Sequence, residues 1–112
     1  MSRRYYIKGE VANGDFTSDL MSSGFSKAEL ASIIFFSDEY KTITTPTAGT
    51  VVFTLTPDDV HYKTVENGTF DAKDSYDGNR KAPNAANLAI RANVNLNGVV
   101  GATHFLATIW RA

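Results

Sequence analysis

Alternation of apolar and polar residues is the main pattern along the chain, and it predicts strands. Over residues 88–96 every second residue is apolar, and the residues between them include Arg91, Asn93 and Asn95. A period of two places one row on each face of a strand. We therefore expect the apolar row to be buried, whereas the polar row is either wetted or in contact with a partner.

The same alternation predicts further strands, which Gly, Asn, Asp and Pro separate as turn residues. Tyr5 and Ile7 should face inward in the first of them, and Val51, Phe53 and Leu55 in a later one. The further strands are expected at residues 4–11, 50–56, 61–65 and 104–111, with 69–72 as a continuation. Turns are expected at Asn13-Gly14-Asp15, Pro57-Asp58-Asp59, Glu66-Asn67-Gly68 and Asn97-Gly98, and an extended connection at 42–50.

Residues 25–40 carry two opposed signals. Ser26 and Glu29 have the spacing of a capping box, which favours a helix that starts at Lys27. The β-branched and aromatic run that follows favours a strand instead. We expect one helical turn at most, followed by a strand over 32–36.

Many short strands with little helix predict an all-β fold, namely an antiparallel β-sandwich or jelly-roll-like domain with at most one short helix. Residues 1–112 should form a single domain, since 112 residues suit one small domain. A parallel α/β fold would need helical crossovers, and the pattern has none. Residues 74–86 are the most polar stretch and are expected to form a long surface loop.

Composition narrows the class of function. The chain is 43% hydrophobic and 21% charged, with a net charge of −1, which is ordinary for a folded domain and unlike the basic excess of a nucleic-acid binder. It contains no cysteine, so disulfides and thiolate metal sites are excluded. No stretch resembles a signal peptide or a membrane span. We expect no nucleic-acid or membrane partner, and synthesis in a cytoplasm without a targeting signal.

Candidate chemistry is sparse. Asp71, Asp74 and Asp77 stand three residues apart, which does not match the alternate spacing of an EF-hand calcium loop. His61 and His104 lack a visible set of further zinc ligands beyond Asp59, and no nucleophile motif of the G-x-S-x-G type is present. We therefore predict no catalytic residue, no metal site and no cofactor, and we expect a protein that is not an enzyme.

Two kinds of contact surface remain open. Asparagine is poor in strands, so the polar row of residues 88–96 indicates either a wetted face or a subunit contact. The candidate interface residues are Arg91, Asn93, Asn95, Tyr76, Arg80 and Lys81. Exposed aromatic rings could alternatively stack on a sugar. The candidate glycan platform is Tyr62, Tyr76 and Trp110.

Two segments resemble the short β-rich accessory proteins of tailed bacteriophage virions. They are GTVVFTLTPDDVHYKTVENGTFDA (49–72) and ANVNLNGVVGATHFLATIWRA (92–112), and they share with that class short strands, Pro-Asp and Asn-Gly turns and a compact final strand. They cover under half of the chain. The resemblance implies a virion structural protein, either a capsid decoration protein or a tail or fibre component. It also implies a homo-oligomer, with a trimer favoured, that docks on other virion proteins. A carbohydrate-binding β-sandwich module is the alternative.

Overall fold

The computed structural model describes residues 3–20, 28–74, 80–81 and 90–111. Within this part the chain forms nine strands and one short 3-10 helix. The strands are β1 (Arg3–Glu10), β2 (Gly14–Thr17), β3 (Ala28–Phe36), β4 (Ile43–Thr44), β5 (Ala48–Thr56), β6 (Lys63–Asp71), β7 (Arg80–Lys81), β8 (Arg91–Val100) and β9 (His104–Arg111), and η1 spans Ala72–Asp74.

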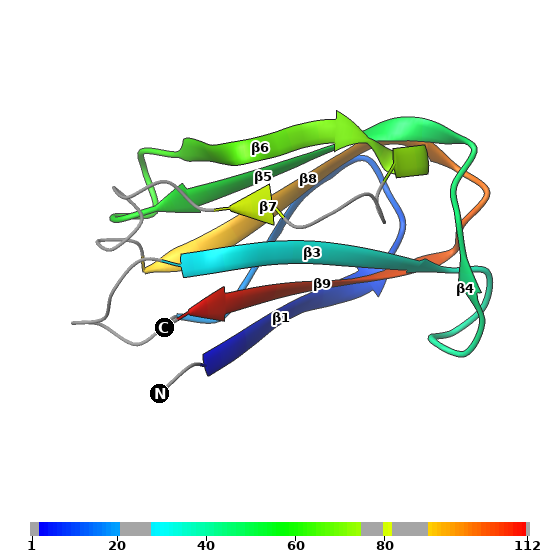
Figure 1. The fold of residues 1–112 in the computed structure, drawn as a ribbon, viewed down its shortest axis with the longest axis horizontal. Coiled ribbons are helices and arrows are strands. Elements are labelled where there is room, and N and C mark those ends of the chain that lie inside the picture. Colours follow the sequence, from blue (N-terminus) through cyan, green and yellow to red (C-terminus); the bar gives the residue numbers. More distant parts are fainter. Residues whose placement is uncertain (1–2, 21–27, 75–79, 82–89, 112) are drawn as a thin grey trace.

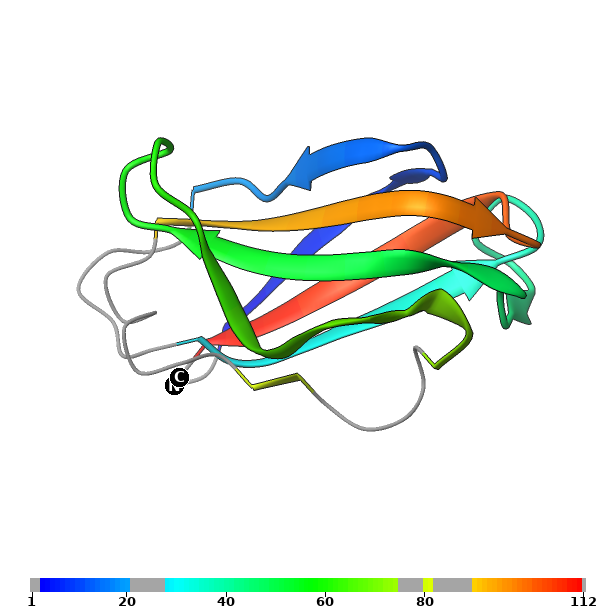
Figure 2. The same cartoon turned by 90° about the horizontal axis from the view of Figure 1, so that it is seen from above.

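The strands form two antiparallel sheets that pack face to face, so the predicted β-sandwich is confirmed (Figure 1). The first sheet contains β1, β9 and β3, with β4 and β7 on β3. The second sheet contains β2, β8, β5 and β6. The strand order is β1-β9-β3-β7-β6-β5-β8-β2, because β6 pairs with β5 on one side and with β7 at Glu66 on the other. Figure 2 shows the second sheet lying across the first.

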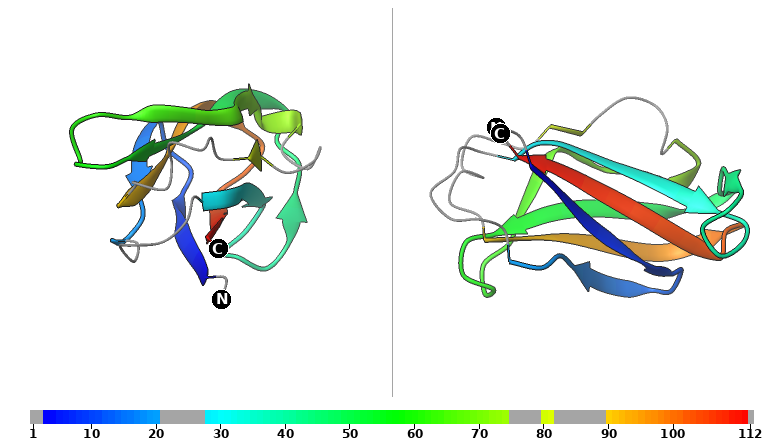
Figure 3. Two further views of the ribbon diagram at one scale, coloured as in Figure 1. Left: turned by 60° about the vertical axis from the view of Figure 1, so that its left-hand side comes forward. Right: turned by 90° about the horizontal axis from the view of Figure 1, so that it is seen from below.

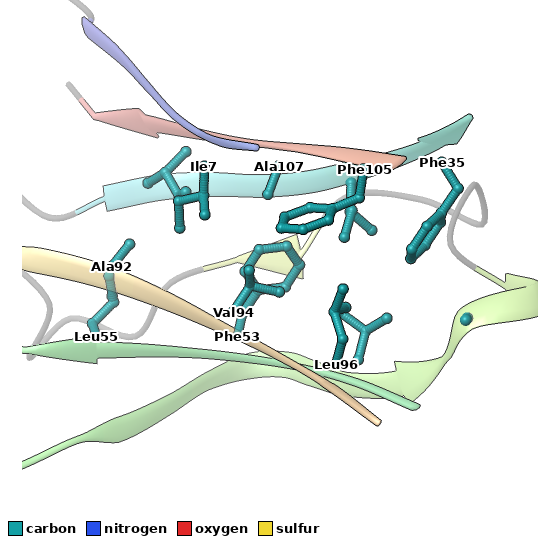
Figure 4. Packing of buried hydrophobic residues seen from close by; sticks show 13 residues of the cluster. Ile7, Phe35, Phe53, Leu55, Ala92, Val94, Leu96, Phe105 and Ala107 are labelled. Atoms are coloured by element: carbon teal, nitrogen blue, oxygen red, sulfur yellow. The ribbon is translucent and has the colours of Figure 1, made fainter. Parts of the chain in front are cut away.

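The core lies between the sheets and is filled by the predicted inward rows (Figure 4). Val51, Phe53 and Leu55 on β5 are at most 4% exposed, which confirms the predicted inward row of that strand. Phe16 of β2 packs edge-on against Phe105 of β9, with 4.8 Å between ring centroids. The other buried apolar residues of the cluster are Ile7, Ile33, Phe35, Ala72, Ala92, Val94, Leu96, Ala107 and Ile109.

The expected strand over 32–36 is confirmed and begins four residues earlier, so no helical turn forms in the described part of residues 25–31. Ala28 already pairs with Arg111 of β9, and the ladder then continues to Phe36 opposite His104. Backbone groups in a ladder with β9 on one side cannot also close helical hydrogen bonds. Ser26 and Lys27 lie outside the described residues.

The two Asn-Gly turns are also wrong, because both dipeptides lie inside strands. Asn97 and Gly98 belong to β8, where one extra residue relative to β5 forms a bulge and Gly98 takes a φ of 67°. The turn into β9 falls at Gly101 instead, with a φ of 93°. Asn67 and Gly68 lie in β6, at the irregularity where β6 advances five residues while β5 advances two.

Smaller differences concern edge and connecting strands. β2 begins at Gly14, inside the expected 13–15 turn, and β4 lies in the expected 42–50 connection. β7 interrupts the expected 74–86 loop, so that loop is not continuous. The final strand at 104–111 and the turn at 57–59 are confirmed.

Candidate binding and contact surfaces

The polar row of β8 faces outward from the second sheet and anchors the edge strand β2. The Nδ2 groups of Asn93 and Asn95 donate hydrogen bonds of 3.1 and 2.9 Å to the same atom, Oδ1 of Asp15. Asp15 is directly opposite Asn95 in the β2–β8 ladder. The bond from Asn95, followed by that from Asn93, lowers the pKa of Asp15 below its ordinary value of 3.8, so the carboxylate is ionised at neutral pH.

Arg91, at the start of the same row, is also held within the chain. Its Nη1 donates to the carbonyl oxygen of Ser18 at 2.9 Å, and its Nε lies 3.0 Å from Oδ1 of Asp59. The Arg91 side chain is 29% exposed. Arg91, Asn93 and Asn95 therefore each have at least one partner inside the molecule, and a contact of this row with a neighbour stays a prediction.

A hollow of about 340 Å³ lies beside this row on the outer face of the second sheet. Its lining residues are Asp15, Thr17, Thr54, Tyr62, Asn93 and Asn95. Tyr62 is half exposed at its rim. Oγ1 of Thr54 is buried and has no hydrogen-bond partner among the described residues. A carboxylate, two amides, hydroxyl groups and one aromatic ring suit a polyhydroxylated ligand, since each hydroxyl group can both donate and accept.

The turn after β5 brings Asp58 and His61 together. Oδ1 of Asp58 accepts the backbone N–H of Val60 at 2.9 Å and of His61 at 2.7 Å, and the His61 Nδ1 lies 2.6 Å from Oδ2. The backbone N–H of His61 is the main cause that lowers the pKa of Asp58 well below 3.8. The pair caps a turn, in which Asp59 has a φ of 63°.

His104 lies at the opposite end of the sandwich from the 57–61 turn (Figure 1), where its Nδ1 is 3.0 Å from Oγ1 of Thr103. In the described ranges no group of three or more His, Asp or Glu residues could hold a metal ion. Asp77 of the aspartate series lies outside those ranges. No helix of the described part is long and apolar enough to cross a membrane.

Part of the outer face of the first sheet is apolar and aromatic, which sequence reasoning missed. A hollow of about 410 Å³ on this face is lined by Tyr6, Lys8, Phe36, Tyr40 and Leu106. The Phe36 and Tyr40 rings pack edge-on, with 5.5 Å between their centroids. The Lys8 Nζ lies 5.4 Å from the centroid of the Tyr40 ring. We call these five residues the outer apolar face. The available signal was that Tyr6 and Leu106 are large apolar residues in the row opposite to the core row.

The loop that carries Tyr40 onto this face is organised by Asp38. Its Oδ1 accepts the backbone N–H groups of Lys41 and Thr42 at 2.9 and 2.7 Å, and its Oδ2 accepts the Thr42 hydroxyl. The backbone bond from Thr42 is the largest cause that lowers the pKa of Asp38. Tyr40 has a φ of 61°, a rare value for a residue with a side chain, and such outliers gather at functional sites.

The remaining predicted site residues cannot be placed in a surface. Tyr76 lies outside the described residues. Arg80 and Lys81 form β7, whose backbone pairs with Ala31 and Leu30 of β3, and Trp110 lies opposite Arg4 in the β1–β9 ladder. The side chains of Arg80, Lys81 and Trp110 lie outside the described part.

Comparison of the chain with models of known protein families, with curated proteins and with solved structures finds no match.

Proposed function

We propose that the chain is a non-enzymatic structural protein of a bacteriophage virion, a capsid decoration or tail-associated component. It acts by associating with copies of itself and by docking on a larger particle. The observation that carries the assembly part is the outer apolar face. The phage part rests on the resemblance of segments 49–72 and 92–112, which supply the paired strands β5 and β6 and the consecutive strands β8 and β9, one in each sheet.

The first sheet carries apolar side chains on part of its outer face as well as on its inner face. The inner face of the first sheet already packs on the core through Ile33, Phe105 and Ala107. On its outer face, Leu106 pairs with Ile34 on one side and Lys8 on the other, and Tyr6 next to them is 53% exposed. Contiguous apolar surface of this kind marks contact sites in soluble proteins. Association would also add stability to a small domain with a thin core.

The test combines molar mass in solution with binding to particles. Light scattering across a range of concentrations should show an oligomer, and the chain should be found in purified virions by mass spectrometry. Leu106→Glu should weaken association because it places a charge in the outer apolar face. Val60→Glu is the matched control, since Val60 is 71% exposed in a turn at the end of the second sheet. A monomer at every concentration that is also absent from virions would refute the proposal.

Glycan binding is a second candidate function, and the hollow beside the Arg91, Asn93 and Asn95 row favours it. Tyr62, a residue of the predicted glycan platform, lies at the rim of this hollow together with Asn93 and Asn95. Binding on a glycan array should be saturable and should be lost in Tyr62→Ala, but kept in Tyr6→Ala, which removes an equally exposed tyrosine from the other sheet. An array without any bound glycan would rule this function out.

A further inference from the structure

Strand β1 forms the margin of the first sheet. It pairs with β9 along all eight of its residues, from Arg3 opposite Arg111 to Glu10 opposite His104. Within the described residues no strand pairs with its other edge. The right view of Figure 3 shows β9 between β3 and β1, so that β1 is the last strand of this sheet. An edge of this length presents a row of backbone groups that can pair with another strand.

The two faces of β1 differ in a way that restricts how a second strand can be added. Tyr5 and Ile7 face the core, whereas Arg4, Tyr6 and Lys8 alternate with them on the outer face. We consider β1 of a second copy as the added strand, antiparallel to the first and related to it by a twofold axis. Core-facing residues then lie opposite core-facing residues only when the residue at the axis pairs with the same residue of the copy. The axis can therefore pass through Tyr6, Ile7 or Lys8 near the middle of the strand.

The register centred on Ile7 is self-complementary. It places Arg4 opposite Glu10 of the copy, and Tyr6 opposite Lys8 of the copy, on the outer face. Opposite charges in directly opposed positions attract, and an ammonium group beside an aromatic ring is favourable. On the inner face Tyr5 comes opposite Gly9, so no two large side chains are directly opposed there. This register also pairs all residues from 4 to 10.

The two neighbouring registers lack this complementarity. With the axis at Tyr6, Arg4 would stand opposite Lys8 of the copy. With the axis at Lys8, each Lys8 would stand opposite the other. Like charges directly opposite one another destabilise a ladder, so the charge pattern selects the Ile7 register.

We infer that β1 pairs with β1 of a second copy in the register centred on Ile7, which gives a continuous sheet in the order β3-β9-β1-β1-β9-β3. The outer apolar faces of the two copies then adjoin on one side of this sheet, with Tyr6 of each beside Lys8 of the other. The inference rests on the self-association in the proposed function and adds the β1 edge as a second contact surface beside the outer apolar face. It makes a twofold pair the unit of assembly, in place of the trimer that the resemblance implies.

Cysteine pairing tests the register directly, because the chain contains no cysteine of its own. One sample of the chain carries Arg4→Cys and another carries Glu10→Cys. Directly opposed residues lie about 4.5–5.5 Å apart at Cα, within reach of a disulfide. Residues 4 and 10 of one strand are about 20 Å apart. In a dimer of a single variant the two cysteines therefore lie too far apart to form a disulfide. A disulfide-linked dimer should form on mild oxidation of the mixture and not of either variant alone.

A mixture of Arg4→Cys with Glu39→Cys measures cross-linking by random collision, since Glu39 is exposed in the loop after β3. Charge exchange gives an independent readout. Arg4→Glu or Glu10→Arg should each raise the dissociation constant of the dimer roughly tenfold, and the double variant should restore it, because the pair is only reversed in sign. Lys73→Glu and Glu39→Arg are matched controls at exposed sites outside β1. Thermal unfolding by circular dichroism checks that each variant folds.

The outcomes separate this inference from the proposed function. A cross-link confined to the mixture, with rescue by the double variant, supports the β1 pair. An oligomer by light scattering without that cross-link overturns the β1 pair and leaves assembly through another surface. A monomer at every concentration also overturns it, and the presence or absence of the chain in virions then decides the proposed function.

Discussion

The Nδ2 of Asn95 donates a hydrogen bond of 2.9 Å to Oδ1 of Asp15, and this bond joins the long strand β8 to the short edge strand β2. β2 has only four residues, of which Phe16 packs on the core. Such a strand gains little from apolar burial. Polar bonds from Asn95 and from its neighbour Asn93 therefore supply part of its attachment, which explains asparagine at strand positions that otherwise disfavour it.

Asp15→Ala should detach this anchor. The variant removes the acceptor of two amide groups, one of which belongs to Asn93, a residue only 6% exposed. We expect the free energy of unfolding to fall by about 1 to 2 kcal/mol, because one buried donor is left without its partner while Asn95 can bond to water. Urea denaturation measures the change. Asp19→Ala, an exposed aspartate just beyond β2, should change the stability much less.

The free energy of unfolding should fall in acid, because three carboxylates accept hydrogen bonds in the folded chain. The pKa values of Asp15, Asp38 and Asp58 are lowered in the folded chain from 3.8, so folding favours their ionised forms. Their contribution is complete above about pH 5 and is lost as the pH falls through 3.8 towards the lower folded values. The stability difference between wild type and Asp38→Asn should therefore shrink between pH 7 and pH 3 in urea titrations.

The control for this titration is Thr47→Ala, which removes no ionisable group. Its stability difference from the wild type should stay the same at both pH values. A difference for Asp38→Asn that is equal at pH 7 and pH 3 would show that the hydrogen bonds to Asp38 do not depend on its charge.

The sequence was informative wherever apolar alternation alone decides the structure. The inward rows of β5 and β8 and the full extent of β9 were predicted, because a sandwich must bury one face of each strand. The Asn-Gly dipeptides misled because the same conformational freedom serves a bulge as well as a hairpin turn. Gly98, for example, has the positive φ that a turn needs, yet β8 continues to Val100.

The candidate surfaces were predicted only in part, since they depend on pairing between distant segments. The row of Arg91, Asn93 and Asn95 could be read from the alternation, but its partners Asp15 and Ser18 lie more than seventy residues earlier in the chain. The outer apolar face needs the β1–β9–β3 order, which local patterns do not encode. Short strands such as β4 and β7 form through the neighbours they meet and carry no strong pattern of their own.

Gly49→Ala should be strongly destabilising, for two reasons that act together. A Cβ at this position would lie 2.5 Å from the Cα and 2.7 Å from the backbone nitrogen of Val99, and the φ of Gly49 is 116°. Backbone atoms of a paired strand cannot move aside cheaply, so we expect a loss of more than about 3 kcal/mol. Gly98→Ala is the comparison, since it has a positive φ of 67° and no atom near its Cβ. It should lose only about 1 kcal/mol from backbone strain.

Chemical denaturation of the two glycine variants separates the effect of the contact with Val99 from the effect of the positive φ. If Gly49→Ala loses no more stability than Gly98→Ala, β5 and β8 do not approach at Val99 as closely as the structure places them.

Arg91→Glu should lower the stability of the fold itself. The variant loses the bond to the Ser18 carbonyl and the contact with Asp59, and it places a carboxylate beside both oxygen atoms. We expect a loss of about 2 kcal/mol in the free energy of unfolding, because a partly buried charge-assisted bond is replaced by repulsion. Arg91→Gln removes the charge without the repulsion and should lose less. Urea denaturation of the three proteins gives the order, and equal stability of wild type and Arg91→Glu would show that Arg91 does not hold the Ser18 segment. Because Arg91→Glu destabilises the fold, a loss of assembly in this variant could come from unfolding alone. It indicates a subunit contact at Arg91 only when the wild type and the variant are compared under conditions in which both are fully folded.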